Sequence, residues 1–104
     1  MKHTEITKQL SEIIHSKAPD AKVILYGSQA RGDARPDSDI DLLILLNTDK
    51  VSFEDETRIT YPLYALELET GIIISPMVLA RKQWENRPFK TPFYINVMNE
   101  GIEL

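Results

Sequence analysis

Two aspartates spaced two residues apart, at the start of an apolar segment, are the residues best suited to chemistry. Asp39 and Asp41 lead into the apolar run 42–46, which is typical of a buried strand. Side chains alternate along a strand, so both carboxylates are predicted to point to the same face. Like charges held this close repel each other, more strongly when they are partly buried. A cation is therefore expected between them, and Mg²⁺ is the natural candidate because it takes carboxylate, water and phosphate oxygens.

A Gly-Ser pair upstream of the aspartates could hold the anion that such a cation attracts. Gly27 and Ser28 follow the apolar residues 23–26. Glycine lets a ligand approach the backbone, and free N–H groups at the start of a helical turn favour phosphate. The chain contains neither a Walker A sequence nor a dinucleotide-binding fingerprint. The alternatives are an ordinary strand-to-helix cap for this pair, and a solvated strand entry balanced by nearby arginines for the aspartates.

The elements that would position these residues predict an α/β (α+β) fold. Core strands are predicted at 23–26, 39–46 and 72–79. Helices are predicted at 4–17, 28–32, 52–69, 81–86 and 92–100. Pro62 is expected to kink or divide the helix at 52–69, and Pro76 is expected to place the third strand at a sheet edge. The expected architecture is a small mixed sheet of about three core strands packed with helices.

The run GSQARGDARPDSDIDLLILL resembles the signature of the DNA-polymerase-β-like nucleotidyltransferase superfamily. Its best match is the smallest branch, the minimal nucleotidyltransferases, which are often encoded beside a HEPN-domain protein. The resemblance implies that Ser28 and the backbone of Gly27 hold the triphosphate of a nucleotide. It also implies that Asp39 and Asp41 are catalytic residues and metal ligands for Mg²⁺, or for Mn²⁺ in its place. Arg31 is expected either to contact phosphate or to brace the loop.

A third carboxylate of that family is not found at its expected place. The family pattern has an acid on the next core strand, but the corresponding segment 72–78 contains none. Ser75 is the expected occupant of that position, and a serine there cannot serve as a general base. Glu67 and Glu69, upstream on the predicted helix, are the candidate substitutes. The departure bears on catalysis rather than on the fold or on nucleotide binding.

The composition limits the classes of protein and partner. The chain has 104 residues, a formal net charge of −4 and no cysteine, which predicts one domain over 1–104 and excludes disulfide frameworks and thiolate metal sites. The acidic balance does not favour direct nucleic-acid binding. The first residues lack a signal-peptide pattern, and no apolar run is long enough to span a membrane. A cytoplasmic location without membrane contact is therefore expected.

One basic segment stands out in this acidic chain. Residues 81–90 contain four basic residues and one acid, together with Trp84 and Phe89. The segment could face the triphosphate or a partner protein. The alternative, which we favour, is a helix whose two aromatic residues lie in the core while the charged groups reach the solvent.

These observations lead to one expected function and two alternatives. The chain is expected to bind Mg-NTP, with ATP as the expected nucleotide, and to transfer a nucleoside monophosphate to a hydroxyl of a partner macromolecule. By the resemblance, that partner is a HEPN-family protein, and the chain is its antitoxin in a toxin–antitoxin system. The first alternative is a catalytically impaired nucleotidyltransferase fold that neutralises its partner by contact. The second is a small antibiotic-modifying transferase, which the lack of a drug-binding domain disfavours.

Overall fold

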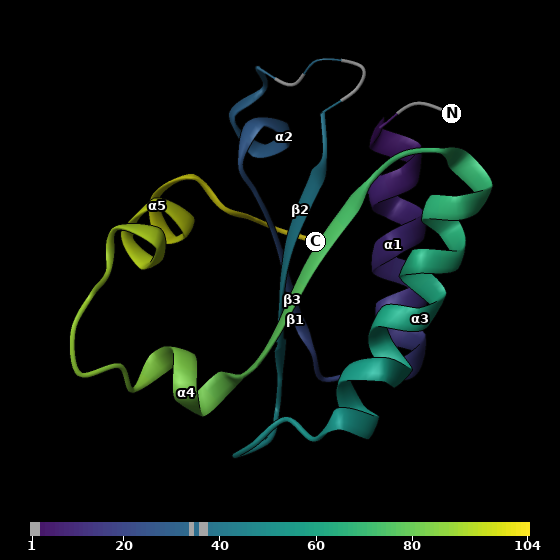
Figure 1. Ribbon diagram of the computed structural model, residues 1–104. Helices are drawn as coiled ribbons and strands as arrows, with labels where there is room; N and C mark the ends of the chain where they lie inside the picture. Colours follow the sequence, from purple (N-terminus) through teal and green to yellow (C-terminus); the bar gives the residue numbers. More distant parts are fainter. Residues whose placement is uncertain (1–2, 34, 36–37) are drawn as a thin grey trace.

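A four-stranded mixed sheet forms the centre of the computed structural model, which describes residues 3–33, 35 and 38–104 (Figure 1). The strands are β1 (Lys22–Tyr26), β2 (Ile40–Leu46), β3 (Ile74–Ala80) and β4 (Ile102–Glu103). Their order across the sheet is β3-β2-β1-β4; β2 is parallel to β3 and antiparallel to β1. The three predicted strands are confirmed, and β3 is an edge strand, as Pro76 indicated. The two-residue β4, antiparallel to β1, was not predicted because it is too short to show alternation.

The central strand β2 is buried on both faces, as its apolar sequence predicted. Leu42, Ile44 and Leu46 belong to one core cluster, whereas Leu43 and Leu45 belong to another. All five are at most 3% exposed. Successive side chains of a strand point to opposite faces, so β2 contributes alternately to the two layers that cover the sheet.

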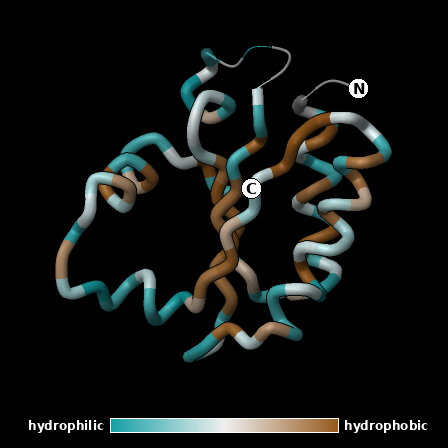
Figure 2. The backbone as a smooth tube through the Cα atoms, viewed as in Figure 1, coloured by the Kyte–Doolittle hydropathy of each residue, from teal (hydrophilic) through white to brown (hydrophobic). Residues whose placement is uncertain are grey.

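The larger cluster lies between the sheet and two long helices, α1 (His3–Lys17) and α3 (Phe53–Thr70), which lie on the same side of the sheet (Figure 1). The apolar residues that face the sheet recur at helical spacing, which is the pattern that predicted both helices. From α1 and α3 they are Ile6, Leu10, Ile14, Ile59, Leu63 and Leu66. Figure 2 shows the apolar strands of the sheet beside these two helices, along which apolar and polar residues are mixed.

The ends of α3 follow the predicted signals, and Pro62 lies within the helix without dividing it. Ser52 caps the first turn: its hydroxyl accepts a hydrogen bond from the Asp55 backbone N–H at 3.0 Å, and its own N–H donates to Asp55 at 3.3 Å. Gly71 ends the helix with a φ of 75°. The expected division at Pro62 does not occur, since α3 is one helix of 18 residues. Burial of apolar residues before and after Pro62 holds both halves against the sheet and offsets the lost backbone hydrogen bond.

The smaller cluster lies on the opposite face, under the short helices α4 (Arg81–Glu85) and α5 (Pro92–Glu100). Trp84 is 3% exposed and stacks edge-on against Phe93, with ring centroids 6.0 Å apart. Phe89, expected in the core with Trp84, is instead exposed in the connection between the helices. The guanidinium of Arg87 lies 4.9 Å from the centre of the Trp84 ring, so part of the basic segment packs on the aromatic cluster.

In the part of the chain that the structure describes, no helix combines the length and apolar character that a bilayer crossing requires.

Candidate functional site

Asp41 lies near the start of β2, in a row of polar side chains across three strands. The register pairs Asp41 with Tyr26 of β1 and with Ser75 of β3. Paired residues of adjacent strands share a face, so all three side chains lie on the face that carries Leu43 and Leu45. This is the face covered farther along by α4 and α5. The prediction that Ser75 occupies the strand position next to the aspartates therefore agrees with the register.

Gly27 brings the backbone directly against the Asp41 carboxylate. Its φ is 76°, a conformation that side chains disfavour. A Cβ atom at this position would lie 2.5 Å from Oδ2 of Asp41. The short helix α2 (Ser28–Arg31) begins immediately after Gly27 and ends at Gly32, whose φ is 81°. Glycine at position 27 thus leaves room beside Asp41 that any other residue would fill.

The two aspartates are close enough for their charges to interact, as their spacing predicted. Burial raises the pKa of Asp41, the negative charge of Asp39 raises it further, and the positive charge of Arg31 opposes both effects. Asp39 is exposed and directly precedes β2, whose first residue, Ile40, donates its N–H to the Ile73 carbonyl at 2.9 Å. Two hard oxygen donors that repel each other suit a divalent cation of the Mg²⁺ class, so the residues present fit the expected metal.

Tyr26 is a neighbour of the aspartates that the sequence analysis did not identify. Burial raises the pKa of its phenol, and the charge of Asp41 raises it further. Its ring meets that of Phe93 edge-on, with centroids 5.4 Å apart. The only sequence signal was its place at the end of the strand before Gly27, because the pairing of Tyr26 with Asp41 depends on the antiparallel register.

Arg31 is held by two carboxylates in this structure. Its Nε donates to Oδ2 of Asp33 at 3.3 Å, and its Nη1 donates to Oε1 of Glu100 at 3.3 Å. Glu100 is the last residue of α5, so the second contact ties α2 to the layer that covers the site face. This arrangement is the bracing role expected for Arg31. The positive charge of Arg31 also lowers the pKa of Asp41, so Arg31 lies near enough to the aspartate to influence its ionisation.

Ser28 is the first residue of α2, at the same end of the sheet as Asp41. Among the described residues, its hydroxyl has no hydrogen-bond partner. The predicted loop between α2 and β2 is described only in part: the Arg35 N–H donates to the Ser38 hydroxyl at 2.8 Å, and Ala34, Pro36 and Asp37 lie outside the described residues.

The two glutamates considered as substitutes for the third carboxylate lie on the other side of the sheet. Glu67 belongs to α3, and its Oε1 accepts a hydrogen bond from the Ile74 N–H at 2.8 Å. Glu69 is an exposed residue of the same helix. Over the described ranges, no three His, Cys, Asp or Glu side chains gather in a metal-binding group. The residue that faces Asp41 from β3 is Ser75.

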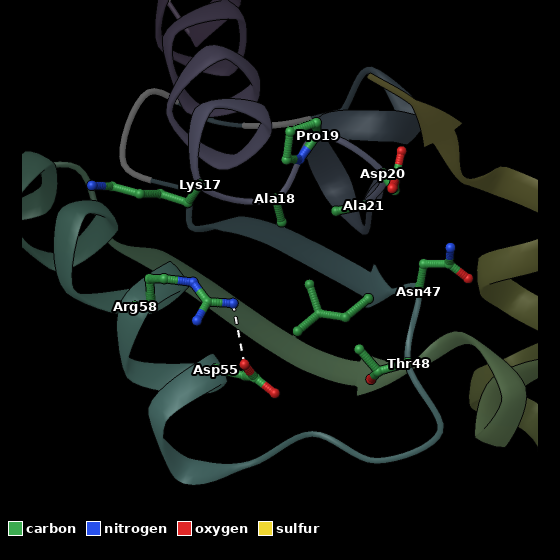
Figure 3. Close-up of a pocket in the computed structure, with 10 residues that line it drawn as sticks. Lys17, Ala18, Pro19, Asp20, Ala21, Asn47, Thr48, Asp55 and Arg58 are labelled. Carbon is green, nitrogen blue, oxygen red and sulfur yellow. Dashed lines mark hydrogen bonds and ion pairs between the residues drawn. The ribbon is translucent and has the colours of Figure 1, made fainter.

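A pocket of about 160 Å³ lies at the opposite end of the sheet (Figure 3). It is formed where α1 ends, β2 ends and α3 begins, and Leu46 and Thr48 are among its lining residues. Its Arg58 is paired with Asp55 at 3.1 Å, shown as a dashed line. The pocket contains none of the predicted site residues and is separate from the aspartate site.

Comparison with known sequences agrees with this geometry. The sequence profile of the nucleotidyltransferase domain matches residues 7–103. The chain is 33% identical over 100 residues to "Putative protein adenylyltransferase MJ0141" of Methanocaldococcus jannaschii, covering 96% of this chain and 92% of that protein. It is 35% identical over 80 residues to "Putative protein adenylyltransferase MJ0604" of the same organism, covering 77% of this chain and 73% of that protein.

Solved structures share the fold at lower identity. A "putative nucleotidyltransferase from Sulfolobus solfataricus" has a TM-score of 0.60 at 19% identity, over 95% of this chain and 76% of that one. A toxin–antitoxin structure with AMP-PNP has a TM-score of 0.59 at 18% identity, over 92% and 69%. A mutant of the toxin–antitoxin MntA-HpeT has a TM-score of 0.57 at 17% identity, over 99% and 72%. The profile spans most of the chain and the sequence relatives exceed 30% identity, so this chain belongs to the nucleotidyltransferase-domain family.

Proposed function

We propose that this protein binds a Mg²⁺-nucleoside triphosphate, with ATP as the nucleotide, and transfers the nucleoside monophosphate to a hydroxyl of a partner protein. The observation that carries the proposal is the Asp41 carboxylate beside the side-chain-free face of Gly27, with Asp39 close enough to raise its pKa. The names of the two sequence relatives support protein adenylylation. The AMP-PNP in one structural neighbour, an analogue of ATP, supports the choice of nucleotide.

In the proposed reaction, the acceptor hydroxyl oxygen forms a bond to the α-phosphorus of the triphosphate. The bond from that phosphorus to the bridging oxygen breaks, pyrophosphate leaves, and the hydroxyl proton passes to water or to a carboxylate. Asp39 and Asp41 would hold Mg²⁺, which when bound would offset the negative charge of the phosphates and favour ionisation of the hydroxyl. Ser28 would donate its hydroxyl to a phosphate oxygen, which Gly27 allows to approach the backbone.

The proposed partner is a HEPN-family protein, with this chain as its antitoxin. The two toxin–antitoxin structures with the same fold support a partner of this general kind. The acceptor hydroxyl would then belong to the toxin, and its modification would silence it. A HEPN protein encoded in the neighbouring reading frame is the expected candidate.

The test is transfer of label from [α-³²P]ATP to the purified HEPN-type protein. The native chain should label it in the presence of Mg²⁺ and not in the presence of chelator. Asp39→Asn combined with Asp41→Asn should abolish both transfer and the Mg²⁺ dependence of ATP binding, measured by calorimetry. Asp20→Asn is the matched control, because Asp20 is an exposed carboxylate at the opposite end of the sheet. Equal ATP affinity of the native chain in Mg²⁺ and in chelator would contradict the proposed site.

A second function, neutralisation of the partner by contact alone, is favoured by Ser75. A serine beside Asp41 offers neither the negative charge nor the basic group of a third carboxylate, and general-base assistance is typically worth about 10²–10⁴ in rate. A chain that binds Mg-ATP and inhibits the toxin without labelling it would support this second function. Ser75→Asp would then be expected to increase labelling.

A further inference from the structure

The outer side of α3 carries a row of exposed apolar and aromatic side chains that the proposed site does not use. Phe53, Tyr61, Tyr64 and Leu68, here called the α3 stripe, are 78%, 67%, 44% and 86% exposed. Their spacings of eight, three and four residues place them on one face of the helix. The buried residues of α3 face the sheet from the other side, so the exposed stripe points away from the core.

Thr57 lies between Phe53 and Tyr61 on the same face of the helix, but it does not present a free polar group. Its hydroxyl donates back to the helix, to the Phe53 carbonyl at 3.0 Å and to the Glu54 carbonyl at 3.2 Å. With a rise of 1.5 Å per residue, the stripe is about 22 Å long. Clustered exposed apolar residues with two tyrosines are typical of surfaces that bind another protein.

The polar residues that flank the stripe are acidic. Glu54, Glu56 and Glu69 are exposed, and none of them forms an ion pair with another described residue. The single base of α3, Arg58, is already paired with Asp55 at 3.1 Å. The helix therefore presents an apolar centre with a negatively charged rim.

This charge pattern distinguishes between the surfaces that could cover the stripe. In a two-fold dimer through α3, an antiparallel arrangement would bring Glu54 and Glu56 of one copy toward Glu69 of the other, and like charges would repel. An anionic membrane surface would repel the same rim. A protein with an apolar surface bordered by lysine and arginine matches both the centre and the rim.

We propose that the α3 stripe docks the partner protein of the proposed function through such a surface; this inference rests on that function. The position of the stripe fits the role. Leu68 lies in the last turn of α3, from which the chain passes through Gly71 to β3 and to Ser75, the strand neighbour of Asp41. A partner along α3 would extend toward the end of the sheet that holds the aspartates, without covering the face on which Asp41 lies.

The test measures binding of the full chain to the purified HEPN-type protein by surface plasmon resonance, together with ATP binding by calorimetry. Tyr61→Ser combined with Leu68→Ser should raise the dissociation constant for the partner at least about 100-fold, since exposed aromatic anchors are typical hot spots. The matched control is Phe89→Ser, because Phe89 is 75% exposed but lies between α4 and α5. This control should retain partner affinity, and both variants should retain native ATP affinity and circular dichroism.

A second variant tests the acidic rim. Glu54→Gln combined with Glu69→Gln should slow association with the partner at low salt and make the rate less sensitive to added salt. The inference is overturned if the stripe variant keeps native partner affinity, if the Phe89 control loses it equally, or if the native chain does not bind the partner. It is also overturned if the native chain forms a dimer that the stripe variant lacks.

These outcomes separate the docking surface from the proposed reaction. Loss of partner binding in the stripe variant, with no label transferred by the native chain, would support the docking surface and contradict the transferase activity. Label transfer by the native chain, with partner affinity unchanged in the stripe variant, would contradict the docking surface alone.

Discussion

Along β2, Leu42, Ile44 and Leu46 pack against α1 and α3, whereas Leu43 and Leu45 pack against α4 and α5. The first face is apolar along the whole strand and includes Ile40, which is completely buried. On the second face, the apolar cluster stops at Leu43, and the next position on that face is Asp41, which is only partly buried. The comparison shows how one strand can combine stability with reactivity: one layer is complete, and the other ends where the ionisable groups begin.

Deletion of side-chain atoms on the two faces of β2 should test this division most strongly. Ile44→Ala, on the face of α1 and α3, should lower the free energy of unfolding by about 2–5 kcal/mol, because it leaves a cavity in the larger cluster. Leu43→Ala, on the other face, should cost less because the smaller cluster has five buried members against fourteen, so fewer buried neighbours surround the cavity. Urea unfolding measures both costs, and calorimetry should show weakened ATP binding for Leu43→Ala only. Equal ATP affinity in the two folded variants would contradict the division.

Two aspartates, one from the site and one from a helix cap, should show opposite effects of pH on stability. The pKa of Asp41 is raised, first by burial and then by Asp39, so its ionisation destabilises the folded state as pH rises. The pKa of Asp55 is lowered, first by the backbone N–H of Ser52 and then by the Ser52 hydroxyl. The ionised Asp55 carboxylate therefore stabilises the folded state at pH values above the pKa that Asp55 has in the unfolded chain. This stabilisation is lost as the pH falls through the pKa that Asp55 has in the folded chain.

Thermal unfolding at pH 7 and near pH 3 measures this contrast. Asp41→Asn should have a modestly higher Tm than the native chain at pH 7, and the difference should shrink toward pH 3. Asp55→Asn should have a modestly lower Tm at pH 7, and that difference should also shrink toward low pH. If Asp41→Asn and Asp55→Asn changed the Tm at pH 7 in the same direction, the opposite effects of the two carboxylates on stability would be contradicted.

The smallest expected effect concerns the contact between α2 and α5. The pair formed by Arg31 and Glu100 is partly exposed to solvent, so Glu100→Gln should change stability by no more than about 1 kcal/mol. The same change should tighten ATP binding by a few-fold, because it removes a competing carboxylate from Arg31 and a negative charge near the triphosphate. Calorimetry measures the change. Weaker binding would instead identify Glu100 as a residue that positions Arg31 for the nucleotide.

Local patterns were sufficient to predict the main elements of the fold. The apolar residues of β2 indicated an interior strand, and Ser52 and Gly71 marked the ends of α3. Pro62 indicated either a kink or a division of the helix; the division does not occur, because packing on both sides of Pro62 outweighs one lost hydrogen bond. β4 contains too few residues to produce a periodic signal.

The candidate site could be predicted only where its residues are close in sequence. Gly27 and Asp41 were identified from one continuous run, and the structure places them in contact distance of each other. Tyr26 and Glu100 were missed because their positions depend on strand register and on the return of α5 toward α2, which no local spacing encodes. The roles of the predicted residues in nucleotide and metal binding remain predictions.

The hydrogen bond between Glu67 and Ile74 has a consequence for aggregation. Ile73 directs its carbonyl toward β2, so the backbone N–H groups of the alternate residues of β3 face the open edge of the sheet. At Ile74 that donor is already occupied by the Glu67 carboxylate at 2.8 Å, and at Pro76 there is no donor. A strand from another molecule would therefore find no free N–H donor at two successive outward-facing positions of this edge. Glu67 and Pro76 together protect the edge from the strand-to-strand association that leads to aggregates.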